Sequence, residues 1–396
     1  MSEPVRTVTD GERRARLGLR HALGERVPDP VAAAAAVVCL HATELASVYL
    51  SAWARSGASR ADVDRCLYAD RTIVRQLAMR RTVFAFPRDL LPAVRGSAAA
   101  RVARQQAAQL ARGVVAAGLA TDGAAWVDQA CADALALLRN TPATTRQLRA
   151  QLPALGERLP PPEQAGAAPV PVAPRILTVL AAGGGVVRGA NDGGWKRSRP
   201  YWTPTETWLG SAVRPLPEAE GYAELVSRWL WAFGPGTTAD ITWWLGATKT
   251  AVRRALADVG AVAVSLDDGS PAWLHPDDAA EIGSAAPWAA LLPALDPTTM
   301  GWRDRNFYID QPTAAVVYDR AGNGKPTAWW QGRIVGQWAQ RNDGTVIVVP
   351  AVPLTASAAA ALKHQAAQLT AWLDGDVIRS AFQSPRAPGE HGEIIL

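Results

Sequence analysis

The fold is indicated most clearly by the stretch Thr237–Leu274, which reads TTADITWWLGATKTAVRRALADVGAVAVSLDDGSPAWL. Its first half has apolar residues at helical spacing, behind threonines at 237 and 248 that are placed to cap two helices. Its second half alternates like two strands around the turn Asp267–Gly269. Another helix is expected just upstream, over Glu218–Phe233. Three helices followed by a hairpin predict a winged helix, with the third helix as a possible groove reader.

The same order of elements is expected further upstream in a second, less regular copy. Helices are expected there over Ala124–Leu138, from Thr144 onward and over Arg175–Ala182, with a basic wing over Val186–Trp202. A Pro- and Gly-rich insertion, Pro153–Pro174, interrupts this copy.

A first copy is expected near the N-terminus. Helices are expected over Ser59–Leu67 and Thr72–Met79, followed by a short strand over Arg80–Phe86. A long helix over Leu91–Val115 is expected to close this copy.

Beyond about Ala285 the pattern is mostly β. Short β runs separated by Gly and Asn turns are expected at Phe307–Ile309, Ala314–Tyr318, Thr327–Trp330, Arg333–Gln340 and Thr345–Val349. An alanine-rich helix over Thr355–Leu373 follows. The predicted fold class is α+β, mainly α, with three tandem winged-helix modules and a C-terminal small β-barrel or meander with a closing helix. The expected domains are residues 1–120, 121–212, 213–285 and 286–396, since 396 residues exceed one typical core.

Positive charge is concentrated in one part of the chain. The net charge is +5, yet the window from Arg71 to Arg112 has nine arginines, no lysine and one acidic residue, a net charge of +8. A clustered basic excess favours an anionic partner such as nucleic acid. The candidate phosphate contacts are Arg71, Arg75, Arg80, Arg81, Arg101, Arg104, Lys196, Arg197, Arg199, Arg253 and Arg254.

Other classes of function have little support in the composition. The three cysteines are far apart, as is typical of reduced thiols in a cytosolic protein. There is no CxxC or HExxH spacing, so we expect no metal, and no motif points to a cofactor. No stretch is long and apolar enough to span a membrane, and no signal peptide is recognisable. We therefore expect a soluble, cytoplasmic protein.

The candidate site follows the most apolar helix expected in the chain. Asp29 and Pro30 are typical of a helix start, and Val31–Leu40 is apolar throughout, which predicts a fully buried helix. His41-Ala42-Thr43-Glu44 comes next, at a junction with a second, amphipathic helix. The alternative interpretation is purely structural, because a histidine commonly caps one helix end while threonine and glutamate begin the next helix.

Several further runs point to a known family. They are Leu291–Pro297 (LLPALDP), Gly301–Arg305 (GWRDR) and Arg333–Trp338 (RIVGQW). Together with the three winged helices and the buried helix before His41, they resemble the AlkZ/YcaQ-like winged-helix DNA glycosylases, over about residues 13–382. The resemblance implies excision of N7-alkylated purines from double-stranded DNA and unhooking of crosslinks, including bulky adducts of natural products against which a producer protects itself.

The resemblance also suggests roles for the candidate site. The family motif is Gln, an apolar residue, then Gln or Asp, and the matching residues here are His41, Ala42 and Thr43. Neutral His41 can accept a proton from the attacking water or orient it, whereas Thr43 can only hydrogen-bond that water. Glu44 is the alternative base, or a negative charge that stabilises the sugar cation.

Three further expectations concern mechanism and competing functions. The four lysines are Lys196, Lys249, Lys325 and Lys363, all far from His41 in sequence, so a Schiff-base lyase step is not expected. The main rival is a non-catalytic winged-helix DNA-binding protein, either a regulator or a drug-adduct binder; no dimerisation segment is evident, and a monomer is expected. A hydrolase of another kind would need a nucleophile motif that the sequence lacks.

Overall fold

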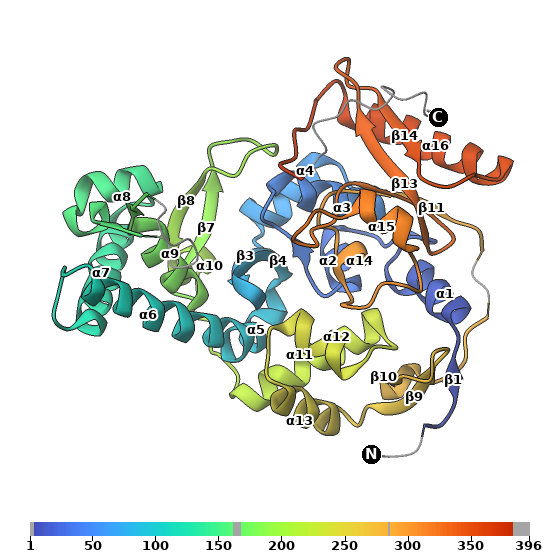
Figure 1. Ribbon diagram of the computed structural model, residues 1–396. Helices are drawn as coiled ribbons and strands as arrows, with labels where there is room; N and C mark the ends of the chain where they lie inside the picture. Colours follow the sequence, from blue (N-terminus) through green and yellow to red (C-terminus); the bar gives the residue numbers. More distant parts are fainter. Residues whose placement is uncertain (1–3, 161–167, 284–285, 383–396) are drawn as a thin grey trace. The chain divides into compact units, whose positions relative to one another are not determined.

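The computed structural model describes residues 4–160, 168–283 and 286–382, and contains helices and strands along its whole length (Figure 1). The elements form two compact units. The first contains the described residues up to Cys66 and from Ala223 on, and the second is Leu67–Tyr222. The expected mixture of helices and strands is confirmed, while the four module boundaries stay a prediction. None of the helices among the described residues is long and apolar enough to cross a membrane.

The stretch that indicated a winged helix folds as expected. Its helices and strands are α11 (Glu218–Phe233), α12 (Thr238–Leu245), α13 (Lys249–Val259), β9 (Val262–Leu266) and β10 (Pro271–Leu274). Thr237 and Asp240 form a capping box, and Thr248 caps α13. The strands pair antiparallel, and β1 (Thr7–Val8) adds to β9 in parallel. Residues near the start of the chain thus complete this small three-stranded sheet, which the sequence did not indicate.

The C-terminal region is an antiparallel meander. Its strands are β11 (Ala289–Leu292), β12 (Thr327–Trp330), β13 (Arg333–Gln340) and β14 (Val346–Pro350), in that spatial order. The helix α16 (Ala356–Leu373) packs against β11 and β14. Among the described residues the sheet is open, so the expectation of a meander is confirmed and that of a closed barrel is not.

Two strands expected in this region are wrong, and one real strand was missed. Residues 307–309 are not extended into a strand, and residues 314–318 fall mostly in α15 (Gln311–Val317). Asp310 caps α15, and the proline at its second position has a backbone angle suited to a helix start. These helix-start signals outweigh the preference of the β-branched residues in this stretch for a strand. The missed strand, β11, ends on the first two residues of the LLPALDP run, and the short helix α14 (Pro297–Met300) begins at the last residue of that run.

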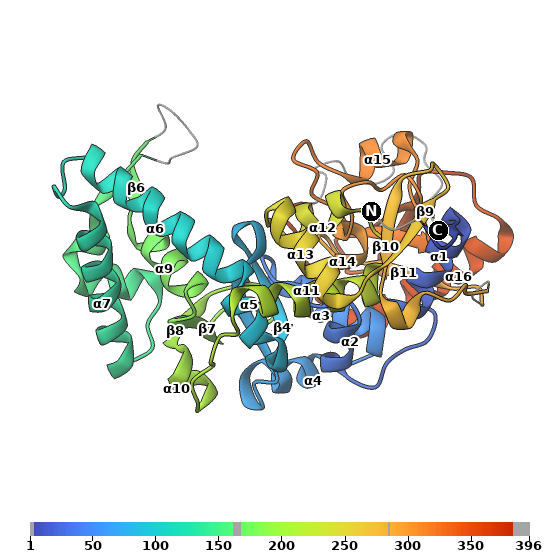
Figure 2. The ribbon, with the colours of Figure 1, turned by 90° about the horizontal axis from the view of Figure 1, so that it is seen from below.

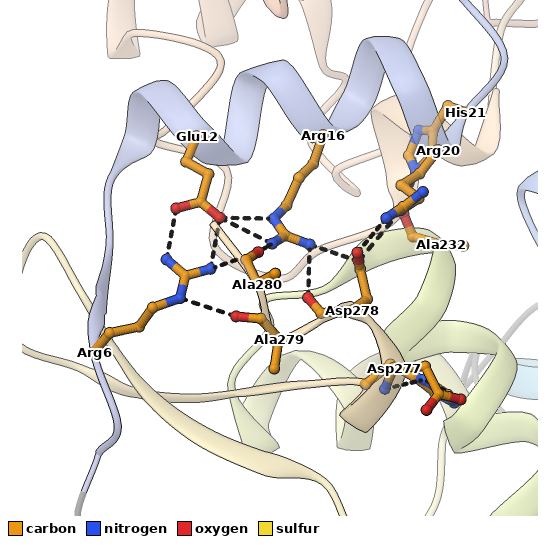
Figure 3. A network of polar contacts seen from close by, with 11 residues as sticks. Arg6, Glu12, Arg16, Arg20, His21, Ala232, Asp277, Asp278, Ala279 and Ala280 are labelled. Carbon is orange, nitrogen blue, oxygen red and sulfur yellow. Dashed lines mark hydrogen bonds and ion pairs between the residues drawn. The ribbon is translucent and has the colours of Figure 1, made fainter. Parts of the chain in front are cut away.

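A charged network anchors α1 (Asp10–Arg20), the first helix, to the turn that follows β10 (Figure 3). Glu12 accepts hydrogen bonds from Arg6 at 2.7 Å and from Arg16 at 2.9 Å. Arg16 also donates to Asp278 at 2.5 Å, and Arg20 contacts the same carboxylate. Because Arg16 and Asp278 are almost fully buried, each charge depends on the others for compensation. The network therefore fixes α1 against this turn.

The second unit begins with a hairpin of β3 (Ile73–Ala78) and β4 (Thr82–Pro87). The helix expected over Thr72–Met79 is therefore wrong. All six residues of β3 are buried, including the polar Arg75 and Gln76. The long helix expected over Leu91–Val115 is divided at Ser97, whose φ of −125° and ψ of −96° are not helical, into α5 (Leu91–Gly96) and α6 (Ala98–Ala116).

The rest of the second unit follows the expected second copy. Its elements are α7 (Gly123–Asn140), α8 (Thr145–Gln151), β5 (Arg158–Leu159), β6 (Val170–Pro171), α9 (Ala173–Ala182), β7 (Val186–Asn191), β8 (Pro200–Pro204) and α10 (Thr205–Leu209). Figure 2 shows α6 beside α7 and α9, which pack on it. The helices and the basic hairpin of this copy are confirmed; part of the Pro- and Gly-rich insertion lies outside the described residues.

Candidate active site

The apolar helix before the candidate site is shorter than expected. Asp29 caps α2 (Pro30–Ala36) as predicted, but the helix ends four residues earlier than the apolar run suggested, and Ala35 is exposed. Val38 then takes a positive φ of 67°, which is strained for a β-branched residue by about 1–3 kcal/mol. The chain continues into β2 (Leu40–His41). His41 therefore lies in a short strand and does not cap a helix.

His41 is 8% exposed, and Nδ1 of its ring faces the backbone two residues further on. The backbone N–H of Thr43 points at Nδ1 over 3.5 Å, the outer limit of a hydrogen bond. In a neutral ring with Nδ1 as acceptor, the proton is on Nε2. In this state Nε2 of His41 is a hydrogen-bond donor. Nδ1 can accept a proton only after its contact with the Thr43 N–H is broken.

Thr43 and Glu44 lead into α3 (Leu45–Ser56), a helix that starts as expected. Thr43 is exposed. Glu44 is the N-cap residue by backbone geometry, yet its side chain makes no capping hydrogen bond. Instead its carboxylate accepts hydrogen bonds from the Ser380 hydroxyl and the Ala381 N–H, each at 2.6 Å. Glu44 therefore begins α3, as the structural interpretation expects, but its carboxylate contacts the C-terminal segment and does not cap the helix.

The polar face of α3 is buried rather than solvated, which corrects the expected amphipathic pattern. Ser47, Ser51 and Arg55 recur every four residues, and all are at most 3% exposed. Ser47 donates to the carbonyl of Ala294 at 3.0 Å, and Ser51 donates to Asp296 at 2.6 Å. These hydrogen bonds hold α3 against the LLPALDP run. They therefore fix the position of the helix that begins directly after Glu44.

Arg55 and Asp296 form a fully buried ion pair at the centre of this contact. The two guanidinium nitrogens donate to the two carboxylate oxygens at 2.7 and 2.9 Å. Burial by itself would raise the pKa of Asp296, but Arg55, Ser51 and the Thr298 N–H outweigh it and hold the pKa below its ordinary value. Sequence reasoning missed this pair; the four-residue spacing of polar side chains on α3 was the available signal.

The pair extends into a chain of hydrogen bonds that ends at His21. Arg55 donates to the Thr298 hydroxyl at 2.8 Å, and that hydroxyl lies 2.8 Å from His21 Nδ1. The other ring nitrogen, Nε2, lies 3.0 Å from the carbonyl of Ala232. Burial, followed by the charge of Arg55, lowers the pKa of His21 to about 3, so the ring is neutral at physiological pH. A carbonyl only accepts, so Nε2 donates and Nδ1 accepts from Thr298.

The arginines of the β3–β4 hairpin divide into exposed and buried groups. Arg80 and Arg81 form the turn, both exposed and both with positive φ, 51° and 61°. Arg75 is 3% exposed and donates to the carbonyls of Arg188 and Gly189 in β7. Arg71 lies 4.4 Å over the ring of Trp208 and donates to its carbonyl. Arg75 thus joins strands within the unit, which does not suit a surface contact with phosphate.

The other candidate DNA contacts are mostly at the surface. Lys196, Arg197 and Arg199 are exposed in the β7–β8 loop, and Asn191 supports this loop through the Arg197 carbonyl and the Arg199 N–H. The remaining four are Arg101, which is half-buried, Arg104, which pairs with Glu218 at 3.3 Å, Arg253, which is exposed, and Arg254, which pairs with Asp258 at 3.6 Å.

Arg305 of the GWRDR run has a structural position. It donates to the carbonyls of Trp302 and Gly322 and lies 4.2 Å over the ring of Tyr318. These contacts give Arg305 a structural role within the C-terminal region. Within the described ranges, no three His, Cys, Asp or Glu side chains are grouped so that they could hold a metal ion.

Comparison with known proteins gives two matches. The family model described as DNA glycosylase AlkZ-like matches residues 34–372. Among solved structures, Streptomyces sahachiroi DNA glycosylase AlkZ is similar, with a TM-score of 0.73 and 19% sequence identity, covering 94% of this chain and 99% of that one. Comparison with curated proteins gave no match. At this identity the structural likeness shows a shared fold.

Proposed function

Because this chain belongs to the AlkZ-like DNA glycosylase family, we propose that it hydrolyses the N-glycosidic bond of N7-alkylated guanine in double-stranded DNA, with His41, Thr43 and Glu44 as its catalytic residues. One observation carries the proposal. The sequence His41–Glu44 lies within the family match, and the Glu44 carboxylate is not used to cap its own helix.

The chemistry of the proposed lesion asks little of the protein. Alkylation at N7 makes the base a cation and hence a good leaving group, so the transition state resembles a sugar oxocarbenium ion, as in glycoside hydrolysis. A placed water and a nearby negative charge lower this barrier. His41 orients the water or accepts its proton, Thr43 hydrogen-bonds it from the exposed turn, and Glu44 stabilises the positive charge on the sugar.

The proposed reaction leaves an abasic site and does not cleave the strand. A Schiff-base lyase step needs a lysine amine, and residues 30–66, which contain β2 and α3, include no lysine. Borohydride trapping of a covalent protein–DNA adduct would contradict this part of the proposal.

Basic residues that are exposed or half-buried are the proposed phosphate contacts. They are Arg71, Arg80, Arg81, Arg101, Arg104, Lys196, Arg197, Arg199, Arg253 and Arg254, without the buried Arg75. Such contacts position a duplex without reading its sequence. We further propose three winged-helix modules in a monomer, acting in base excision repair and in self-resistance to a genotoxic natural product.

The test is single-turnover incubation with a duplex carrying one N7-alkylguanine, followed by mild alkaline cleavage at abasic sites. His41→Ala is expected to lower the rate about ten- to ten-thousandfold with little change in duplex binding. His364→Ala, which alters an exposed histidine on α16, is the matched control and should match the wild type. An undiminished rate in His41→Ala would refute the assignment of the site.

A second variant separates the two roles of His41. His41→Gln places a hydrogen-bonding side chain without a basic nitrogen at this position. Substantial retained activity would indicate that His41 orients the water, and a loss equal to that of His41→Ala would indicate that it takes the proton. If the wild type binds the duplex but releases neither a simple nor a bulky N7 adduct, the protein is a non-catalytic DNA binder.

A further inference from the structure

The C-terminal segment Asp376–Phe382, called here the C-terminal strap, is fastened to the unit that contains the candidate site. Asp376 pairs with Arg60 at 2.5 Å, next to the end of α16. The Ile378 N–H donates to the Gln340 side chain at 2.8 Å, and Ile378 itself is 7% exposed. The strap then reaches Glu44, to which Ser380 and Ala381 donate. Three separate attachments in seven residues therefore define its path.

The last of these attachments is made to a proposed catalytic group. Each oxygen of the Glu44 carboxylate accepts one hydrogen bond at 2.6 Å, Oε2 from the Ser380 hydroxyl and Oε1 from the Ala381 N–H. Hydrogen bonds to an ionised acceptor are short and about twice as strong as neutral ones. Because the two oxygens are held by two different donors, rotation of the carboxylate is restricted as well as its position.

We propose that the C-terminal strap is a positioning element of the active site, with Ser380 and the Ala381 N–H holding the Glu44 carboxylate in its working orientation. This inference rests on the proposed function, because it assigns the strap to the same reaction. Glu44 makes no capping bond on α3, so the strap supplies the hydrogen bonds that a helix end would otherwise provide. A half-buried glutamate without such donors would move among several rotamers.

The physical benefit comes from positioning the negative charge before the reaction begins. A negative charge lowers the energy of a sugar cation most when it is already in place and needs no reorganisation during the reaction. The strap provides this by ordering a flexible side chain in advance. An opposite role, in which the strap blocks the site and must leave before DNA binds, predicts that its removal raises the rate.

The first experiment uses variants of Ser380 in single turnover with the N7-alkylguanine duplex. Ser380→Ala should lower the rate of base release about tenfold, the scale of one hydrogen bond to a charged group, with little change in the dissociation constant for the duplex. Ser380→Thr keeps the hydroxyl and should restore most of the rate. In a Glu44→Ala background, Ser380→Ala should have no further effect, since residues that act through one another are not additive.

A second experiment removes the strap with a matched control. A chain ending at Phe382 keeps both donors and should match the full chain, whereas a chain ending at Arg379 loses them and should release base about as slowly as Glu44→Ala. An unchanged rate in the shorter chain would overturn the inference. A faster rate in the shorter chain would also overturn it, by showing that the strap is inhibitory.

Hydrogen exchange without DNA separates failure of the strap from failure of the proposed function. Peptides covering residues 376–382 should be protected in the wild type and lose protection in Glu44→Ala, but not in His41→Ala. Absence of protection in the wild type would overturn the strap whatever the activity. Protection together with loss of base release in Ser380→Ala, but not in His41→Ala, would instead refute the role proposed for His41.

Discussion

Replacing Asp296 by alanine is expected to be among the most destabilising single changes in the chain. The substitution leaves the Arg55 guanidinium at 0% exposure without its carboxylate, and it removes the acceptor of Ser51 and of the Thr298 N–H. Removing one partner of a buried pair costs about 3–5 kcal/mol, because the remaining charge is uncompensated in a medium of low dielectric constant. We expect a loss in this range for the unit that contains α3.

The assay should report on that unit specifically, because a chain of two compact units need not unfold in one step. Native-state hydrogen exchange of peptides from α3 gives the opening free energy of that helix. Asp277→Ala, at an exposed aspartate close in sequence to the buried Asp278, is the control and should stay within about 0.5 kcal/mol of the wild type. A loss below about 1 kcal/mol in Asp296→Ala would refute the role given to the ion pair.

A double variant tests whether the uncompensated charge is the cause. Arg55→Met with Asp296→Leu removes both charges, and it should be more stable than Asp296→Ala alone, because apolar replacements of a buried pair are often close to neutral. The pH dependence gives a second check. The pKa of folded Asp296 lies below its ordinary 3.8, so its stabilisation is present above that value and is lost as the pH falls through the folded pKa. The difference between wild type and variant should be constant from about pH 5 to pH 8.

Two further predictions address other residues. His21 is neutral when folded until about pH 3, whereas it gains a proton near pH 6.5 when unfolded, so it costs stability as the pH falls between these values, by up to about 1.4 kcal/mol per pH unit. His21→Gln should therefore flatten the pH dependence of unfolding between about pH 6.5 and pH 3, and an unchanged curve would contradict the burial of this ring. Arg80→Ala and Arg81→Ala should each weaken duplex binding equally for different sequences and reduce the salt slope by about 1. Arg75→Gln is the comparison, because a buried arginine should leave the salt slope unchanged, and equal slopes in all three variants would refute the division.

Local signals in the sequence predicted the structure correctly where the hydrogen-bond partners are close neighbours in sequence. Thr237, Thr248 and Asp29 each cap a helix by accepting from the N–H three positions further on, and each start was predicted correctly. The predictions failed where tertiary burial decided the structure. The stretch that forms β3 was expected to be a helix, but Arg75 and Gln76 there donate to the distant carbonyls of Gly189 and Ala181, and no local pattern reveals a strand buried on both faces.

In the candidate site, too, local signals were visible in the sequence and tertiary contacts were not. The tertiary contacts of Glu44 bear on whether it is a base or a fixed charge. The place of Glu44 close to His41 could be predicted from the sequence. Its hydrogen-bond donors, Ser380 and Ala381, lie 336 and 337 positions away, and no local pattern connects them to Glu44. A general base must turn a lone pair toward the water, whereas each oxygen of Glu44 already uses one of its two lone pairs in a short hydrogen bond that fixes the orientation of the carboxylate. A carboxylate held in this way is better suited to stabilise a cation from a fixed position than to turn toward a proton. Glu44→Gln keeps the shape and removes the charge, so on this reasoning it should slow base release nearly as much as Glu44→Ala, and a fast Glu44→Gln variant would show that neither role needs the charge.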